Sequence, residues 1–215
     1  VQPTERSRQL SKSVFDTLAA QKADLTDATI RTAVDLRYVD PASVGVLVVD
    51  EITAQQVAEH VGAQMVIYGT IDRQGDFTPR FFVSPDVRGD VTGLNTGAFQ
   101  LGDRPIQFGA GAQFNANADL RTRSSALLYI ITGLTYDLLG RVEQSLEIYQ
   151  QAQAQLKAWP EKGQGKEILY FFLGQAAFFK QFKVGAEEAS GLNDQAKDAF
   201  ERALSSNPAY TRAMI

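Results

Sequence analysis

The hydrophobic positions in the first half of the chain follow two different periods. Leu10, Val14 and Leu18 recur at intervals of four residues, which predicts an amphipathic helix. Val44–Val49 is instead a short, continuous apolar run rich in valine, a pattern typical of a buried strand. The elements predicted for this half are helices at Thr4–Lys22 and Ala28–Tyr38, the strand at Val44–Val49, a helix from Asp50 or Thr53 to His60, and strands at Met65–Ile71 and Phe77–Val83. In the third helix, we expect Ile52, Val57 and Val61 to point inward.

Turn residues set the limits of the predicted sheet. Gln74–Asp76 has the composition of a hairpin turn between the last two strands. Pro79 lies inside the second of them, and because proline cannot donate to a strand ladder, we expect that strand either to lie at an edge or to begin after Pro79. A glycine-rich tract, Ser84–Asn117, follows, in which Ile106–Phe108 is the candidate for a short strand that completes the sheet.

The second half has a helical period and a recurring order of small and large residues. Gly133 and Tyr136 precede Gly140, which is well placed to end a helix because glycine adopts the left-handed conformation at little cost. A second helix is then predicted, with Ser145, Tyr149 and Ala152 on one face. The order returns downstream at Tyr170, Leu173 and Gly174, and then at Ala196, Phe200, Ala203 and Pro208.

These spacings resemble the tetratricopeptide (TPR) repeat, a helix–turn–helix unit of about 34 residues. In such a repeat, small residues let helix backbones approach and aromatic rings fill the gaps between them. Three departures stand out: Ser145 occupies a position that is usually alanine, Pro160 falls about three residues late, and about ten extra residues around Lys183–Asn193 separate the helices of the second repeat. A generic antiparallel helical bundle is the alternative.

We therefore expect an α+β chain of two domains. A small α/β domain with a short mixed sheet occupies residues 1–118, and a TPR-type solenoid of two repeats and the start of a third occupies residues 119–215. Ala54–Asp72 also resembles a segment of the small α/β domains that precede TPR arrays in bacterial signalling and envelope proteins, such as the N-terminal domain of TolB. This second resemblance rests on Gly62, Ala63, Ile67 and Gly69, and implies a placing or sensing domain without catalytic residues.

Charge and composition exclude several classes of partner. The chain carries 21 basic and 25 acidic residues, for a net charge of −4, and neither half is basic, so the sequence lacks the footprint of a nucleic-acid-binding protein. No apolar run reaches the roughly 18 residues that a membrane span requires. The absence of cysteine excludes disulfides and leaves a cytoplasmic or an extracytoplasmic location open. Because the chain begins at Val1 and ends in what resembles the opening turn of another repeat helix, we expect a fragment of a longer protein, with any signal or anchor upstream of it.

No residue pattern in the sequence supports catalysis. Asp50-Glu51 after an apolar run resembles a Walker B strand, but no phosphate-binding loop accompanies it. His60 is the only histidine, which excludes a histidine-rich metal site or a serine–histidine–aspartate triad. We interpret Asp50 as a helix cap and His60 as a surface residue, and we predict no enzymatic activity, cofactor or metal.

The remaining candidate is a binding surface. In TPR arrays the first helices of successive repeats line a concave groove, and the resemblance assigns ten residues of this chain to it: Leu127, Ile130, Leu134, Asp137, Leu138, Ile168, Phe171, Gln175, Phe178 and Phe179. This surface is apolar, and apolar stripes of this size are rarely left in water. Three occupants are open: an apolar peptide or helix of a partner, the chain's own α/β domain or glycine-rich tract, or a self-associated or longer superhelix.

The leading hypothesis from the sequence is thus an interaction scaffold of bacterial type, in which the repeats dock a protein or peptide of unknown identity. A ligand-sensing or regulatory domain is the first alternative, with the α/β half binding a small molecule; Gly69 and the glycine-rich tract suggest it. An enzyme of unrecognised type is the second alternative.

Overall fold

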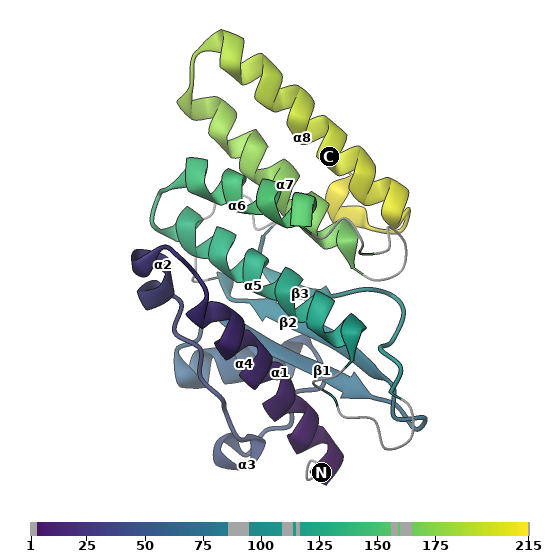
Figure 1. Cartoon of the computed structure of the whole chain (residues 1–215). Helices are drawn as coiled ribbons and strands as arrows, with labels where there is room; N and C mark the ends of the chain where they lie inside the picture. The colour runs from purple at the N-terminus through teal and green to yellow at the C-terminus, as the bar shows by residue number, and fades with distance from the viewer. Residues whose placement is uncertain are drawn as a thin grey trace. The chain divides into compact units, whose positions relative to one another are not determined.

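The computed structural model (Figure 1) describes residues 4–85, 95–108, 114, 117–155, 159 and 165–214. The chain forms two compact units. The first combines Val1–Asp24 with Asp35–Ser124, and the second combines Leu25–Val34 with Ser125–Ile215. The mixed helix-and-sheet class predicted from the sequence is confirmed. The division differs from the predicted one because a short N-terminal segment belongs to the helical unit.

In the first unit, helix α1 (Glu5–Ala23) begins and buries its apolar face as predicted. Thr4 caps it by accepting a hydrogen bond from the Ser7 N–H at 3.2 Å, which satisfies a donor that the first turn leaves without an intrahelical partner. Leu10, Val14 and Leu18 are buried. α1 crosses in front of the sheet in the view of Figure 1.

The predicted strand at Val44–Val49 is wrong. The short helix α3 (Pro41–Val44) occupies its start, Gly45 turns the backbone at φ +67°, and no regular element follows up to Asp50. The Val49 N–H donates at 3.1 Å to the side-chain oxygen of Thr53 instead of to a strand ladder. The run is nevertheless partly buried, since Val48 packs against the core.

Helix α4 (Glu51–Val61) matches the predicted helix. Asp50 and Thr53 form a reciprocal capping box at its start, and Gly62 ends it in the left-handed conformation at φ +66°. Val57 is buried as predicted, but Ile52 is 69% exposed and Val61 is 37% exposed, so the inward placement of these two residues was wrong. Ile52 precedes the buried Val57 by five residues, and five residues turn a helix by about 140°. Ile52 therefore points away from the buried face of α4.

The sheet has three antiparallel strands in the order β1–β2–β3, and not the mixed arrangement expected. Strands β1 (Met65–Ile71) and β2 (Phe77–Val83) have the predicted bounds, and Gly75 at φ +87° makes the turn between them. Strand β3 (Gly97–Gln100) falls in the predicted glycine-rich tract. Ile106 adds an isolated bridge to Phe77, with N···O distances of 2.7 and 2.9 Å, so Ile106–Phe108 extends the sheet by one pair only.

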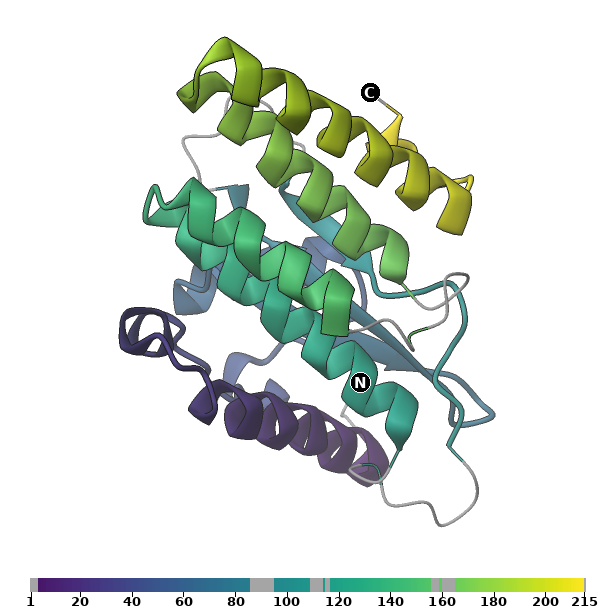
Figure 2. The same ribbon diagram turned by 45° about the horizontal axis from the view of Figure 1, so that its top comes forward.

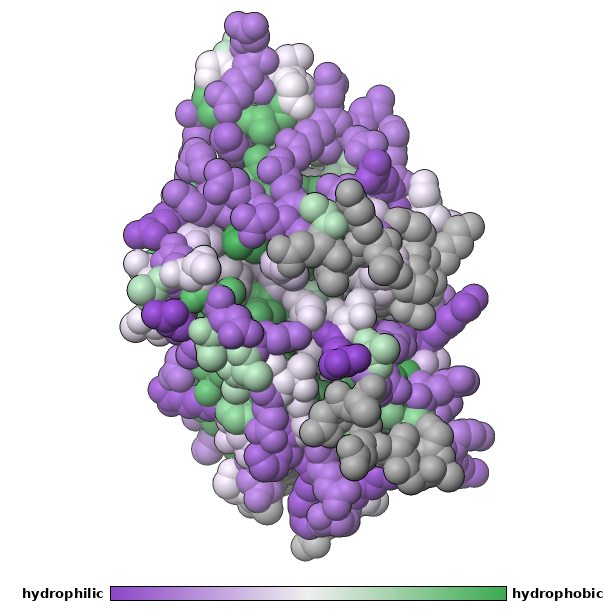
Figure 3. Space-filling model, viewed as in Figure 1, coloured by the Kyte–Doolittle hydropathy of each residue, from purple (hydrophilic) through white to green (hydrophobic). Residues whose placement is uncertain are grey.

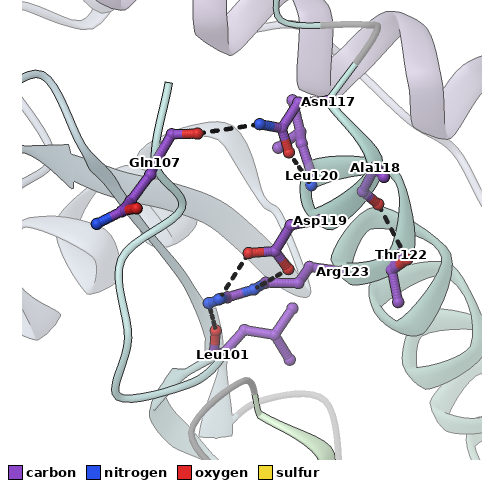
Figure 4. A network of polar contacts seen from close by, with 8 residues as sticks. All are labelled: Leu101, Gln107, Asn117, Ala118, Asp119, Leu120, Thr122 and Arg123. Carbon is purple, nitrogen blue, oxygen red and sulfur yellow. Dashed lines mark hydrogen bonds and ion pairs between the residues drawn. The ribbon is translucent and has the colours of Figure 1, made fainter. Parts of the chain in front are cut away.

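Pro79 lies inside the central strand, which contradicts both predicted alternatives, an edge strand and a strand that begins after Pro79. Its carbonyl accepts the Leu101 N–H at 2.9 Å, and the return bond to the Leu101 carbonyl would need the N–H that proline lacks. Arg123 supplies the missing donor, because its Nη1 lies 2.6 Å from the Leu101 oxygen (Figure 4). A side chain from helix α5 (Ala118–Leu138) thus lets proline occupy an interior strand.

Both faces of the sheet carry a core. On one face, Ala54 and Ala58 of α4 pack against Tyr68 and Phe82. On the other face, the ring of Phe81 stacks on Phe99, with centroids 4.8 Å apart and planes 7° apart. Burial of these aromatic rings stabilises the sheet through the hydrophobic effect and ring stacking.

The second unit is helical. It contains α2 (Ala28–Ala33), most of α5, then α6 (Val142–Gln155), α7 (Lys166–Lys180), the 3₁₀ turn η3 (Gln181–Lys183), α8 (Ala186–Ser206) and the 3₁₀ turn η4 (Thr211–Ala213). Helix α2 is shorter than the predicted Ala28–Tyr38, since Val34 is extended.

The expected separation around Lys183–Asn193 is also wrong. The extra residues mainly extend α8 at its start, and only a short turn separates α7 from α8. Pro160 and about half of the tract between Pro85 and Asn117 lie outside the described residues.

Candidate partner-binding surface of the helical unit

Helices α5 and α6 form an antiparallel hairpin held by a close glycine–aromatic contact. A Cβ atom at Gly133 would lie 2.3 Å from Cζ of Tyr149, a distance that real Cβ contacts do not reach. Tyr149 is fully buried, as is Ala152 one turn further along α6. Gly140, at φ +70°, ends α5, and the Arg141 N–H returns to the Tyr136 carbonyl at 2.9 Å, as in a Schellman cap.

The hairpin of α7 and α8 repeats this contact. A Cβ atom at Gly174 would lie 2.6 Å from Cε1 of Phe200, and the flanking Ala196 and Ala203 are buried. The two glycines and the two aromatic residues hold equivalent places in the recurring sequence pattern. The pattern therefore corresponds to the same physical contact in both hairpins.

A chain of aromatic contacts joins the two hairpins. Tyr149 stacks on Phe172 with centroids 5.9 Å apart, and Phe172 meets Phe171 at 5.4 Å. Phe171 in turn contacts Phe200 at 6.2 Å and Tyr210 at 5.7 Å. Phe171 is therefore part of the core of the helical unit.

The predicted groove residues separate into two groups by burial. Six are buried: Leu127, Ile130, Leu134, Ile168, Phe171 and Gln175. The remaining four are partly exposed: Asp137, Leu138, Phe178 and Phe179. A wide apolar groove is therefore not available on this surface, and the four partly exposed residues lie toward the C-terminal ends of α5 and α7.

These helix ends carry two of the three large apolar side chains that are exposed in the described part of the unit, the third being Met214 near the end of the chain. Phe182 is 70% exposed and Leu139 is 48% exposed. The ring of Phe178 lies 5.7 Å from Phe179 and 5.2 Å from Phe182, both edge to face. Figures 1 and 2 both show the α5–α6 turn and the α7–α8 turn at the same end of the helical unit. We call this set the turn end: Leu138, Leu139, Phe178, Phe179 and Phe182.

Helix α2 is tied to the first hairpin through Asp27. One carboxylate oxygen of Asp27 accepts the backbone N–H groups of Thr29 and Ile30, at 2.8 and 3.2 Å, and the other accepts the Tyr136 hydroxyl at 2.8 Å. The Tyr136 bond is the main reason that the pKa of Asp27 lies below its ordinary value. Burial, followed by the bond to Asp27, raises the pKa of Tyr136 to about 12.

A buried lysine marks the start of α7. Lys166 is 2% exposed, and its Nζ donates to the Trp159 carbonyl at 3.2 Å. The same Nζ lies 5.9 Å from the centre of the Tyr170 ring, and the guanidinium of Arg202 lies 5.7 Å from it. Two cations near one aromatic ring stabilise the packing of α7 on α8 through cation–π attraction.

The residues considered for catalysis have structural roles. Asp50 caps α4, and this hydrogen bonding to Thr53 lowers its pKa below the ordinary value. His60 is exposed, as predicted. The described part of the chain contains no cluster of His, Cys, Asp and Glu side chains suited to a metal ion. Among its helices, none is long and apolar enough to cross a membrane.

Gly69, which suggested a ligand site, has a packing role. A Cβ atom there would lie 2.2 Å from Cε2 of Phe77, so the phenylalanine ring covers the glycine. The glycines at 89, 93, 109 and 111, from the tract that supported the same hypothesis, lie outside the described residues.

Three structural features were missed from the sequence: the Arg123–Asp119 pair, the exposed Phe182 and the link from Asp27 to Tyr136. The Arg123–Asp119 pair has helical i,i+4 spacing and was detectable. Phe182 completes the run that begins at Phe178, and its aromatic spacing was also visible. The link from Asp27 to Tyr136 joins positions 109 apart in the sequence, and no local pattern signals it.

Comparison with known proteins identifies no relative of this chain: no family model, no curated protein and no solved structure matches it.

Proposed function

We propose that the helical unit is a protein-binding module built from two TPR-like hairpins, and that the turn end contacts the partner. The observation that carries this proposal is the exposure of Phe182, at 70%, beside two further phenylalanines that are only partly covered. Aromatic side chains are enriched where protein interfaces concentrate their binding energy.

The surroundings of the turn end support this assignment. In the view of Figure 3, hydrophilic residues cover most of the surface, and hydrophobic residues appear in small separate groups. Lys180 near the turn end pairs with Glu188 at 3.1 Å, so charged side chains border the aromatic cluster. A small apolar centre with a polar rim is the usual composition of a transient protein interface.

The repeated glycine–aromatic contacts supply the second line of support. Because Gly133 and Gly174 bring paired helices close together, the positions of the turns are fixed by packed cores and not by loop conformation. A rigid scaffold that presents side chains at its turns is suited to recognition. We propose no enzymatic activity and no cofactor.

The proposal is tested by comparing two variants that each lose one exposed apolar residue. Phe182→Ser alters the turn end, and Ile52→Ser alters an equally exposed position in the first unit. We expect affinity capture from an extract of the producing cells to retain specific partners with the wild type and Ile52→Ser and to lose them with Phe182→Ser. The same set of partners on all three proteins would contradict the proposal.

A further inference from the structure

Within the described part of the chain, strand β1 has one edge that pairs with no other strand. In the order β1–β2–β3 it pairs with β2 on one side only. Among the described elements, only β2 and α4 contact β1 extensively. Its residues other than Tyr68 are partly exposed along the whole strand.

The register shows which backbone groups point outward. Met65 lies opposite Val83 and Ile71 opposite Phe77. The ladder bond from the Ser84 N–H to the Gln64 carbonyl and the one from the Asp72 N–H to the Asp76 carbonyl are both 3.0 Å long. Because hydrogen-bonded pairs alternate along an antiparallel ladder, the even-numbered residues of β1 bond to β2. The outward N–H and C=O groups therefore belong to the odd-numbered residues, Met65, Ile67, Gly69 and Ile71.

The sequence of β1 itself carries none of the features that protect natural edge strands. Natural edges carry charged residues, proline or a bulge, or are very short. The seven residues of β1 include no charge and no proline, and they pair with β2 without interruption. No described residue donates or accepts a hydrogen bond at the outward groups of β1.

We propose that β1 pairs with β1 of a second copy of this chain, antiparallel about a twofold axis at Tyr68, to form a continuous six-stranded sheet. This axis places Ile67 of one copy opposite Gly69 of the other and Met65 opposite Ile71. All four positions have outward backbone groups, so the pairing forms hydrogen bonds along the full strand. The proposal concerns the first unit and is independent of the function proposed for the helices.

The charges at the ends of β1 and the odd–even alternation of its side chains are both compatible with a second copy of the chain at this edge. The strand is uncharged, and at its ends Asp72 of one copy lies opposite Gln64 of the other, so no like charges meet. An axis at Tyr68 pairs odd residues with odd ones, which keeps each side chain on the same face of the joined sheet. This parity is required for the cores on both faces to continue undisturbed.

A disulfide placed in this register tests the proposal. The chain has no cysteine, and Gln64 and Asp72 are exposed. In the proposed dimer they form a non-hydrogen-bonded pair with Cα atoms about 4.5 Å apart, within the range for a disulfide. Within one chain they lie roughly 26 Å apart and cannot be bridged. The variant with both Gln64→Cys and Asp72→Cys is therefore expected to form a covalent dimer on mild oxidation, whereas Gln64→Cys alone stays monomeric on a non-reducing gel.

Sedimentation equilibrium of the full chain gives the second measurement. We expect concentration-dependent dimers for the wild type and for Ile52→Lys, and monomers for Ile67→Pro, because proline at 67 removes an outward N–H without removing a bond to β2. A folded double-cysteine variant that stays monomeric on oxidation would overturn the proposal. A wild type that is monomeric would also overturn the proposal. The edge of β1 would then be a candidate site for an extended segment of another protein. Dimers that persist in Ile67→Pro would place the interface elsewhere.

Discussion

Arg123 donates its Nη1 hydrogen to the Leu101 carbonyl at 2.6 Å, in the place where β2 would supply a backbone N–H if residue 79 were not proline. The same guanidinium is held by Asp119 through two bonds of 2.9 and 3.0 Å, and it is 1% exposed. Figure 4 shows these contacts beside Asn117, whose side chain accepts the Leu120 N–H at the start of α5. One buried side chain thus completes the sheet and anchors a helix.

Replacing Arg123 with alanine is expected to lower the free energy of unfolding by about 3–5 kcal/mol, because it leaves both the Leu101 carbonyl and the Asp119 carboxylate without their partner. Urea denaturation followed by circular dichroism measures the change. Lys12→Ala is the matched control, since Lys12 and Asp16 form an i,i+4 pair that is exposed; its loss should cost about 0.5 kcal/mol or less. Similar costs for the two variants would contradict the role assigned to Arg123.

The Asp27–Tyr136 hydrogen bond predicts a dependence of stability on pH at both ends of the scale. The pKa of Asp27 is lowered by folding, so its contribution is present above the ordinary pKa of an aspartate and is lost as the pH falls through the folded value. The pKa of Tyr136 is raised to about 12, so its contribution is complete below the ordinary pKa of a tyrosine and is lost as the pH rises toward 12.

Tyr136→Phe should weaken both dependences and raise the pKa of Asp27 toward its ordinary value. Urea denaturation across a pH series measures the first, and an NMR titration of the Asp27 carboxyl carbon measures the second. Tyr38→Phe is the control, because Tyr38 is 40% exposed. An Asp27 pKa that does not change in Tyr136→Phe would show that the tyrosine does not hold the carboxylate.

Replacement of a helix glycine by alanine is predicted to destabilise the protein at two positions and to stabilise it at a third. Gly133→Ala and Gly174→Ala should each destabilise the protein by about 1–3 kcal/mol, since the added Cβ collides with Tyr149 or Phe200. Gly191→Ala in α8 should instead stabilise it by about 0.5–1 kcal/mol, because a Cβ there meets nothing within 4 Å and alanine favours the helix. Thermal denaturation of the three variants tests this. Stabilisation at all three sites would mean that the helices are not closely packed at Gly133 and Gly174.

The features predictable from the sequence are those set by local spacing. The helix bounds at Asp50 and Gly62 and the strands at Met65–Ile71 and Phe77–Val83 depend on residues close together in the sequence. The order of small and large residues in the hairpins is visible as a recurring spacing, whereas the contacts of Gly133 with Tyr149 and of Gly174 with Phe200 join different helices. Packing periodicity and capping chemistry are sufficient for these.

The incorrect predictions depend on distant residues. Pro79 is tolerated in a central strand because of Arg123, and Phe171 is core because Phe200 and Tyr210 contact its ring. Val44–Val49 has the composition of a strand, but the Thr53 side chain takes the Val49 N–H. For the candidate site, the helices were predicted correctly, whereas the division of their apolar residues between core and surface required the tertiary structure.

Photo-cross-linking from the turn end tests the proposed binding function most directly. Phe182 is replaced with the photoreactive residue p-benzoylphenylalanine, and the same residue is placed at Ile52 in a control of equal exposure. After illumination in an extract of the producing cells, we expect discrete cross-linked proteins from position 182 and none of them from position 52, with both variants retaining the thermal transition of the wild type. The absence of cross-links at 182, or an identical set at both positions, would contradict the proposal that the helical unit binds a partner through its turn end.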